Sequence, residues 1–155
     1  RRHTLKLFGN WEMTDEWSLG ANVLVQSGRP LNCFGVLDRN PGPGLSLHPY
    51  GSSFLRCGTT PAGATNDATV VARPRGTAGR LPWTSNLDLN VAYKPTWAEG
   101  LQFKIDVFNV LNRQKVVSVS EIAEDAVSGL PLDTYLLPTA FQAPRQVRFM
   151  VQYDF

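Results

Sequence analysis

Apolar and polar residues alternate along five stretches of the chain, and the pattern is clearest in the last one, residues 145–155. Every second residue there is apolar: Val147, Phe149, Val151, Tyr153 and Phe155. The residues between them are mostly polar. Because successive side chains of a β-strand point to opposite faces, this spacing predicts a strand with one apolar and one polar face.

Four earlier stretches have the same period of two. They cover residues 3–12, 17–26, 84–94 and 101–111. Leu24 is an exception, because it falls on the polar side of the second stretch. We therefore expect five strands of the same two-sided kind.

The connections between these stretches are alternately short and long. Residues 14–16 and 95–100 are short turns, whereas residues 27–82 and 112–144 hold most of the Pro and Gly. Within the second long connection, residues 116–122 either continue the fourth strand or form a small hairpin. Outer-membrane barrels have short turns on the periplasmic side and long loops outside. The pattern favours an all-β fold: an antiparallel, up-and-down transmembrane β-barrel segment of about five strands with two long extracellular loops.

Aromatic residues gather near the short turns: Trp11, Trp17, Tyr93, Trp97, Tyr153 and Phe155. Trp and Tyr favour a membrane–water interface, because one end of the side chain is apolar and the other can form hydrogen bonds. The alternative is that these residues fill the lower part of a soluble core. Their position at one end of every strand favours the membrane interface.

The polar side of the five stretches carries many charges, and we expect five of them to face a barrel lumen: Lys6, Asp88, Lys104, Asp106 and Arg148. Unpaired charge is very costly in the dry interior of a small β-sandwich. A wet or plugged lumen tolerates it, because water or partner groups are available there. Asp88 and Asp106 could also be read as paired catalytic carboxylates. No nucleophile or base lies at a diagnostic spacing beside them, so we expect no enzyme activity.

Composition excludes some classes of partner. The formal net charge is only +2 and no basic run occurs, so we expect no nucleic-acid partner. No apolar run is long enough for a membrane-spanning helix. The chain opens within an alternating stretch and has no initiator Met, so we expect it to be the carboxyl-terminal part of a longer precursor.

Three segments carry motifs of a known family. They are residues 28–35 (GRPLNCFG), residues 87–112 with the sequence DVFNVLN at their end, and residues 144–155, which end in YDF. These segments resemble the strand-to-loop junction, the penultimate hairpin and the terminal strand of TonB-dependent outer-membrane receptors, in particular their Oar-like branch. The two long connections match that family poorly.

The resemblance implies a barrel of roughly twenty-two strands around an amino-terminal plug. It implies uptake of a scarce ligand (siderophore, cobalamin, saccharide or peptide) across the outer membrane of a Gram-negative bacterium, driven through periplasmic TonB. The implied partners are outer-membrane lipid, the plug domain, TonB and the outer-membrane assembly machinery, with Phe155 as an assembly signal. No cofactor is expected.

Cys33 and Cys57 are the only cysteines, and both lie in the first long connection. An even number of cysteines in an exported loop predicts a disulfide. A metal site that includes His48 is an alternative, but it lacks a fourth ligand of clear spacing. Free thiols are the third reading, and no metal is expected.

The first long connection also offers candidate ligand-binding residues: Tyr50, Phe54, Arg73, Arg75 and Arg80. The arginines could bind an anionic ligand or lipid phosphates, and the aromatic residues could form a contact surface. Both groups could instead serve a solvated or self-packed loop. Two other functions remain open: a soluble all-β ligand-binding module, and a porin or adhesin barrel without a plug.

Overall fold

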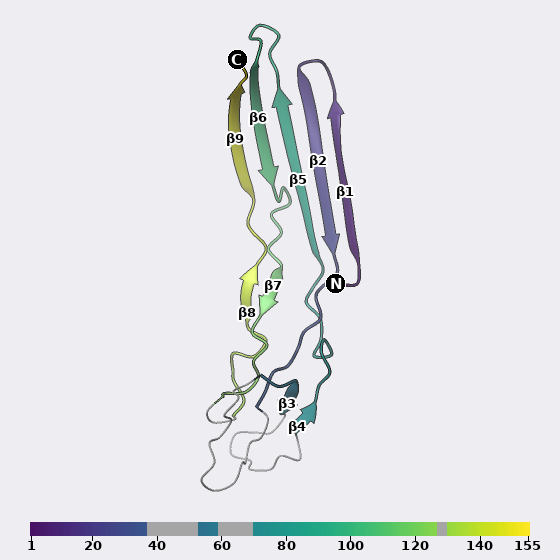
Figure 1. Ribbon diagram of the computed structural model, residues 1–155, viewed down its shortest axis with the longest axis vertical. Helices are drawn as coiled ribbons and strands as arrows, with labels where there is room; N and C mark the ends of the chain where they lie inside the picture. The colour runs from purple at the N-terminus through teal and green to yellow at the C-terminus, as the bar shows by residue number, and fades with distance from the viewer. Residues whose placement is uncertain (37–52, 59–69, 127–129) are drawn as a thin grey trace. The chain divides into compact units, whose positions relative to one another are not determined.

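The computed structural model of the 155-residue chain describes residues 1–36, 53–58, 70–126 and 130–155 (Figure 1). In the part of the chain that the structure describes, strands account for all of the regular structure. Within the described residues no helix is long and apolar enough to cross a membrane. The strands are β1 (Thr4–Glu12), β2 (Trp17–Gln26), β3 (Arg56–Gly58), β4 (Val70–Ala72), β5 (Thr84–Tyr93), β6 (Leu101–Phe108), β7 (Val116–Val119), β8 (Pro138–Phe141) and β9 (Gln146–Tyr153).

Five of these strands form one antiparallel sheet in the order β1-β2-β5-β6-β9. They are the five stretches of alternating sequence, so the all-β, antiparallel five-stranded prediction is confirmed. The order of the strands across this sheet is the same as their order along the chain, which is an up-and-down arrangement (Figure 1). β1 and β9 form the two edges of the sheet.

The register of the five-stranded sheet places even-numbered residues opposite even-numbered ones. Asp106 lies opposite Arg148, and Val107 lies opposite Val147. No register shift interrupts any of the four strand pairs. The odd-numbered, apolar residues therefore share one face across all five strands, and the even-numbered residues share the other.

The apolar face of this sheet is exposed on the edge strands β1 and β9 and half-buried along β5, which has a neighbouring strand on both sides. Leu7 is 57% exposed, Phe149 73% and Val151 67%. By contrast, the buried residues of the sheet unit are few and are mostly small or polar: Gly20, Ser27, Thr84, Ala92, Pro95, Asp106 and Asn109. The sheet therefore leaves most of its apolar surface open, which is unusual for a monomeric soluble protein.

The fourth strand is shorter than the sequence pattern predicts. It ends at Phe108 rather than near residue 111. Asn109 and Asn112 both have a positive φ, 49° and 48°. A left-handed backbone cannot continue a strand, and Asn adopts it more readily than most residues. The alternation of residue types persists past the point where the backbone turns.

The chain divides into two compact units. The sheet unit comprises residues 1–27, 83–115 and 142–155, and the loop unit comprises residues 28–82 and 116–141. In the loop unit β3 pairs with β4, and β7 pairs with β8 with register shifts around Ser118. Residues 116–122 therefore contribute a strand to a small hairpin-like pair, the second of the two possibilities that the sequence left open.

The loop unit joins the two long connections, which the sequence pattern treats as separate irregular segments. Phe34 and Ile122 form a parallel bridge, and Gly35 and Phe54 form an antiparallel one. Among its described residues, the buried apolar ones are Leu31, Cys33, Val36 and Ala123. The long connections are thus an organised unit with a small core of its own.

Candidate functional site

A charged cluster lies on the even-numbered face of the sheet, where β6 and β9 pair. The Arg148 guanidinium donates to Asp106 Oδ2 from Nε and Nη2 at 2.9 and 2.7 Å. Lys104 Nζ lies 3.4 Å from the other carboxylate oxygen of Asp106. The guanidinium also lies over the Phe108 ring, 5.4 Å from its centroid. Two cations thus neutralise one carboxylate whose side chain is only 7% exposed.

Asp88, on β5, has partners of a different kind. Its carboxylate accepts hydrogen bonds from the side-chain amides of Asn22 at 3.3 Å and Asn86 at 2.6 Å, and from the backbone N–H of Asn109 at 2.9 Å. All three donors are neutral, so Asp88 is satisfied by hydrogen bonds rather than by a cation. Lys6, on the edge strand β1, is exposed and makes no ion pair within the described residues. The lumenal role of all five charged residues stays a prediction.

The DVFNVLN segment, residues 106–112, fastens the end of β6 to the start of β9. Asn109 Nδ2 donates to the backbone oxygens of Arg113 and Ala143, at 2.9 and 2.7 Å. Asn112 Oδ1 accepts from the backbone N–H of Arg145 at 3.0 Å. The two asparagines therefore hold the chain on either side of the second long connection. The sequence marks this segment as family-like but does not reveal this role.

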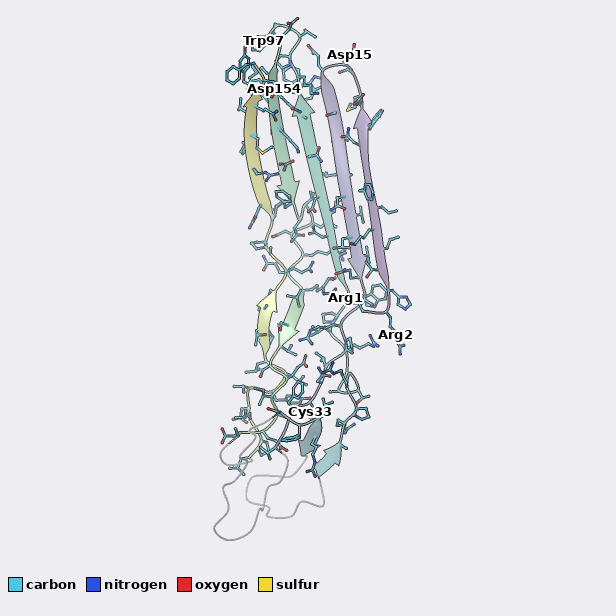
Figure 2. All side chains as sticks on the ribbon, in the orientation of Figure 1. Arg1, Arg2, Asp15, Cys33, Trp97 and Asp154 are labelled. Atoms are coloured by element: carbon cyan, nitrogen blue, oxygen red, sulfur yellow. A yellow bond between two sulfur atoms is a disulfide. The ribbon has the colours of Figure 1, made fainter. Side chains whose placement is uncertain are left out.

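At the other end of the sheet, aromatic rings line up across the strands. Trp17 stacks on Tyr93 at 4.5 Å between ring centroids, and Tyr93 lies 6.5 Å from Phe103. Phe155 contacts Tyr153 edge to face at 5.3 Å and is otherwise fully exposed. Figure 2 shows Trp97, Asp15 and Asp154 at this same end. The aromatic residues therefore form a band on the apolar face beside the short turns.

In the loop unit, Cys33 and Cys57 form a disulfide with their Cα atoms 5.7 Å apart. This is the pairing expected from the sequence, and Cys33 is completely buried. No group of three or more metal-ligating side chains occurs among the described residues. His48, the third residue of the alternative metal site, lies outside them.

Glu121 joins the second long connection to the first. Its carboxylate forms an ion pair with Arg29 and accepts hydrogen bonds from Asn32, from Nδ2 at 2.7 Å and from the backbone N–H at 3.2 Å. Burial acts to raise the pKa of Glu121, but the hydrogen bonds from Arg29 and Asn32 outweigh it. The pKa of this carboxyl is therefore held below its ordinary value.

Glu124 is fully buried beside the disulfide-bonded segment. Its Oε2 accepts a hydrogen bond from the backbone N–H of Val36 at 2.9 Å. The neighbouring Gly35 is packed so tightly that a Cβ atom there would lie 2.6 Å from the Arg56 carbonyl oxygen and 2.5 Å from Glu124 Oε2. Glycine is therefore required at this position by close packing.

The expected ligand-binding residues are not gathered into one pocket among the described residues. Arg73 and Arg75 are exposed beside β4 and in the following turn, and Arg80 donates to the Gly28 carbonyl at 3.3 Å. Phe54 is half-buried and pairs through its backbone with Gly35. Tyr50 lies outside the described residues. A ligand-binding role for these five residues stays a prediction.

Comparison with known proteins gives one match. The chain is similar to a protein of Myxococcus xanthus named "TonB-dependent transporter Oar", with 27% identity over 195 aligned residues. The match covers the whole of this chain and 16% of that protein's length. No family model matches the chain, and no solved structure matches it. The match supports a distant relationship to TonB-dependent transporters.

Four residues that organise the observed contacts have no signal in the alternation: Arg29, Asn32, Glu121 and Glu124. They lie in segments rich in turn formers, where no period separates buried from exposed positions. Charged residues in such a segment read as solvated loop, so their pairing becomes visible only in three dimensions. Within the loop unit, the only contact between distant residues that the sequence predicts is the disulfide between Cys33 and Cys57.

Proposed function

We propose that the sheet unit is part of the wall of an outer-membrane β-barrel, and that the whole protein is a TonB-dependent transporter that takes up a scarce ligand. One observation carries the proposal. The apolar face is continuous over five strands in a single register and is exposed, while the opposite face holds paired charges. A barrel wall has this distribution, with lipid outside and a polar lumen inside.

The even-numbered face supports the same proposal. Asp106 is neutralised by Arg148 and Lys104, and Asp88 is satisfied by amides. Such a face tolerates contact with water or with a polar plug. The similarity to the Myxococcus xanthus transporter is the support for the TonB-dependent class. The plug, TonB, the assembly machinery and the outer-membrane location are parts of this proposal.

The two edges of the sheet also support the proposal of a barrel wall. β1 and β9 each have one unpaired side, and unpaired backbone groups are not tolerated in hydrocarbon. We propose that further strands of the same protein pair with both edges and close the barrel. The two long connections are then extracellular, the short turns are periplasmic, and Phe155 acts in assembly at the periplasmic rim. The protein is not an enzyme in this proposal.

The facing of the sheet can be tested with two neighbouring positions on β9. A nitroxide label on Phe149→Cys should collide readily with oxygen, which concentrates in lipid. A label on Met150→Cys, on the opposite face, should not. The whole protein in phosphatidylcholine vesicles is the sample. If both labels collided equally with a water-soluble nickel complex and neither with oxygen, the sheet would not be a membrane wall.

Transport itself needs a separate experiment. Uptake of radiolabelled ferric siderophores, cobalamin, oligosaccharides and peptides would be compared between cells with and without the gene. Loss of uptake of one class in the deletion strain, together with its loss in wild-type cells treated with a protonophore, is the expected result. Uptake that depends on the gene but continues in the presence of the protonophore would indicate a passive porin instead.

A further inference from the structure

The charges of the sheet unit are separated between its two ends. At the end of the sheet that leads into the long connections, the charged residues of this unit beyond the strand ends are all basic: Arg1, Arg2, Arg113, Lys115 and Arg145. At the short-turn end lie five acidic residues and one basic residue: Glu12, Asp15, Glu16, Glu99, Asp154 and Lys94. Figure 2 shows Arg1 and Arg2 at one end of the sheet and Asp15 and Asp154 at the other. We call the five basic residues the basic rim.

The basic rim is exposed and is not neutralised within the described residues. All five side chains are exposed, and none forms an ion pair there. The side chains of Arg2, Arg113 and Lys115 make no hydrogen bond there either. These three residues donate hydrogen bonds only from their backbone N–H groups. Arg1 and Arg145 contact only neutral oxygens, those of Thr84 and Val110. Five cations without an ion-pair partner in the described parts of the chain attract anions.

The rim also borders the apolar face. Trp83 is 56% exposed and stacks on His3 with the ring planes 4° apart and the centroids 6.0 Å apart. Leu5 and Val25, on the apolar face, form the second register pair from this end. An exposed Trp between apolar side chains and cations is typical of a membrane–water interface. An anion bound at this rim would therefore lie at headgroup depth.

We propose that the basic rim binds the phosphate groups of outer-leaflet lipids, and so fixes the height and tilt of the barrel wall in the membrane. This inference rests on the proposed membrane location. The ligand class is a phosphorylated glycolipid headgroup rather than a free phosphate, because the cations are spread along the ends of several strands. Several phosphates on neighbouring lipids fit that spread, whereas a single small anion contacts only one or two of the cations.

The test uses the whole purified protein in neutral detergent, with bisphosphorylated lipid A as the probe. The variant Arg2→Gln/Arg113→Gln/Lys115→Gln removes three charges whose side chains make no described hydrogen bond. Each charge lost near an anionic surface weakens binding by about five-fold, so the triple variant should bind on the order of a hundred-fold more weakly. The single variant Lys115→Gln should bind about five-fold more weakly, whereas its control Lys94→Gln, at the acidic end, should change binding by less than about two-fold.

Two further measurements separate the possible outcomes. Enzymatically dephosphorylated lipid A should bind the wild type as weakly as lipid A binds the triple variant, and millimolar inorganic phosphate should not displace the lipid. Equal affinity of the wild type and the triple variant for lipid A would overturn the basic rim as a lipid site. Effective competition by inorganic phosphate would do the same. The spin labels at positions 149 and 150 report membrane insertion independently, so this inference can fail while the membrane location stands.

Discussion

In the five-stranded sheet, backbone hydrogen bonds run from strand to strand, and the apolar side chains of one face remain exposed. In the loop unit the strands have three or four residues each, and side chains supply the connections that long strands supply elsewhere. Glu121 and Glu124 there accept hydrogen bonds from residues 89 and 88 positions away along the chain. One region depends on a repeated pattern and the other on a few specific pairs.

The two regions should therefore differ in how their stability responds to substitutions. A sheet whose stability is spread over many backbone bonds tolerates changes at single residues, unless the change reverses the character of a face. A unit with a small apolar core and buried carboxylates depends on each bond, because an unpaired buried polar group is costly.

Reversing the character of the apolar face should produce the largest effect. Phe149→Arg places a charge on that face in the middle of β9, and we expect assembly to be destabilised by about 2–4 kcal/mol. Gln152→Arg, on the polar face of the same strand, should cost less than about 1 kcal/mol. Folding yield of the whole protein in lipid vesicles across a urea series measures both variants. Equal losses for the two would contradict the assignment of the faces.

Removing the disulfide should destabilise only the loop unit. Cys33→Ser/Cys57→Ser opens a cross-link between residues 24 positions apart, which corresponds to roughly 3 kcal/mol. Limited proteolysis should then cut within residues 28–82 while β9 stays protected. Chemical reduction of the wild type should give the same fragments. A cleavage pattern unchanged by either treatment would show that the other contacts of the loop unit are sufficient.

The link formed by Glu121 should be sensitive to pH. Because its folded-state pKa lies below the ordinary value of 4.5, its stabilising contribution is fully present above that value and is lost as the pH falls through the folded pKa. Glu121→Gln should cost about 1–3 kcal/mol at neutral pH, since Arg29 loses its charged partner. Protection of the Asn32 and Phe34 amides from hydrogen exchange, taken relative to the intrinsic rate at each pH, should fall below about pH 4.5 in the wild type. In the Gln variant this protection should already be low at neutral pH and should depend less on pH.

The smallest effect is expected at Glu16, in the turn before β2. Its pKa is lowered by hydrogen bonds from Thr96, with the backbone N–H at 2.9 Å from Oε1. The pKa of Glu16 is shifted in the same direction as that of Glu121, so this hydrogen bond also weakens as the pH falls below the ordinary carboxyl pKa. Glu16 lies in a solvated turn, so Glu16→Gln should change exchange only near residues 14–17 and 94–97. A global loss of stability in this variant would contradict the view that the sheet tolerates single changes.

The sequence was sufficient for the sheet because one physical rule acts over its whole length. Alternation identified all five strands and the common face of their odd-numbered residues. It also placed Leu24 on the polar face, where the register of the structure pairs it with Lys6 and Asn86. It failed at Asn109, because a left-handed backbone residue leaves no trace in a pattern of polarity. Closure of the sheet into a barrel remains a proposal, since it depends on strands outside this chain.

The loop unit could not be predicted in the same way. Its contacts join Glu121 to Asn32 and Glu124 to Val36, across 89 and 88 positions. No local rule connects residues so far apart, and charged residues among Pro and Gly indicate a solvated loop. Only the cysteines pair by chemistry that is visible in one dimension.

The uninterrupted register of the sheet limits how this chain can change in evolution. An insertion of one residue within β2, for example, would move every later side chain of that strand to the opposite face and place Asn22 where Val23 now lies. An insertion of two residues would keep both faces. Strand lengths can therefore change in steps of two, whereas the long connections can gain or lose any number of residues at low cost in chain entropy. Relatives of this protein should differ by even numbers within strands and by arbitrary numbers between them.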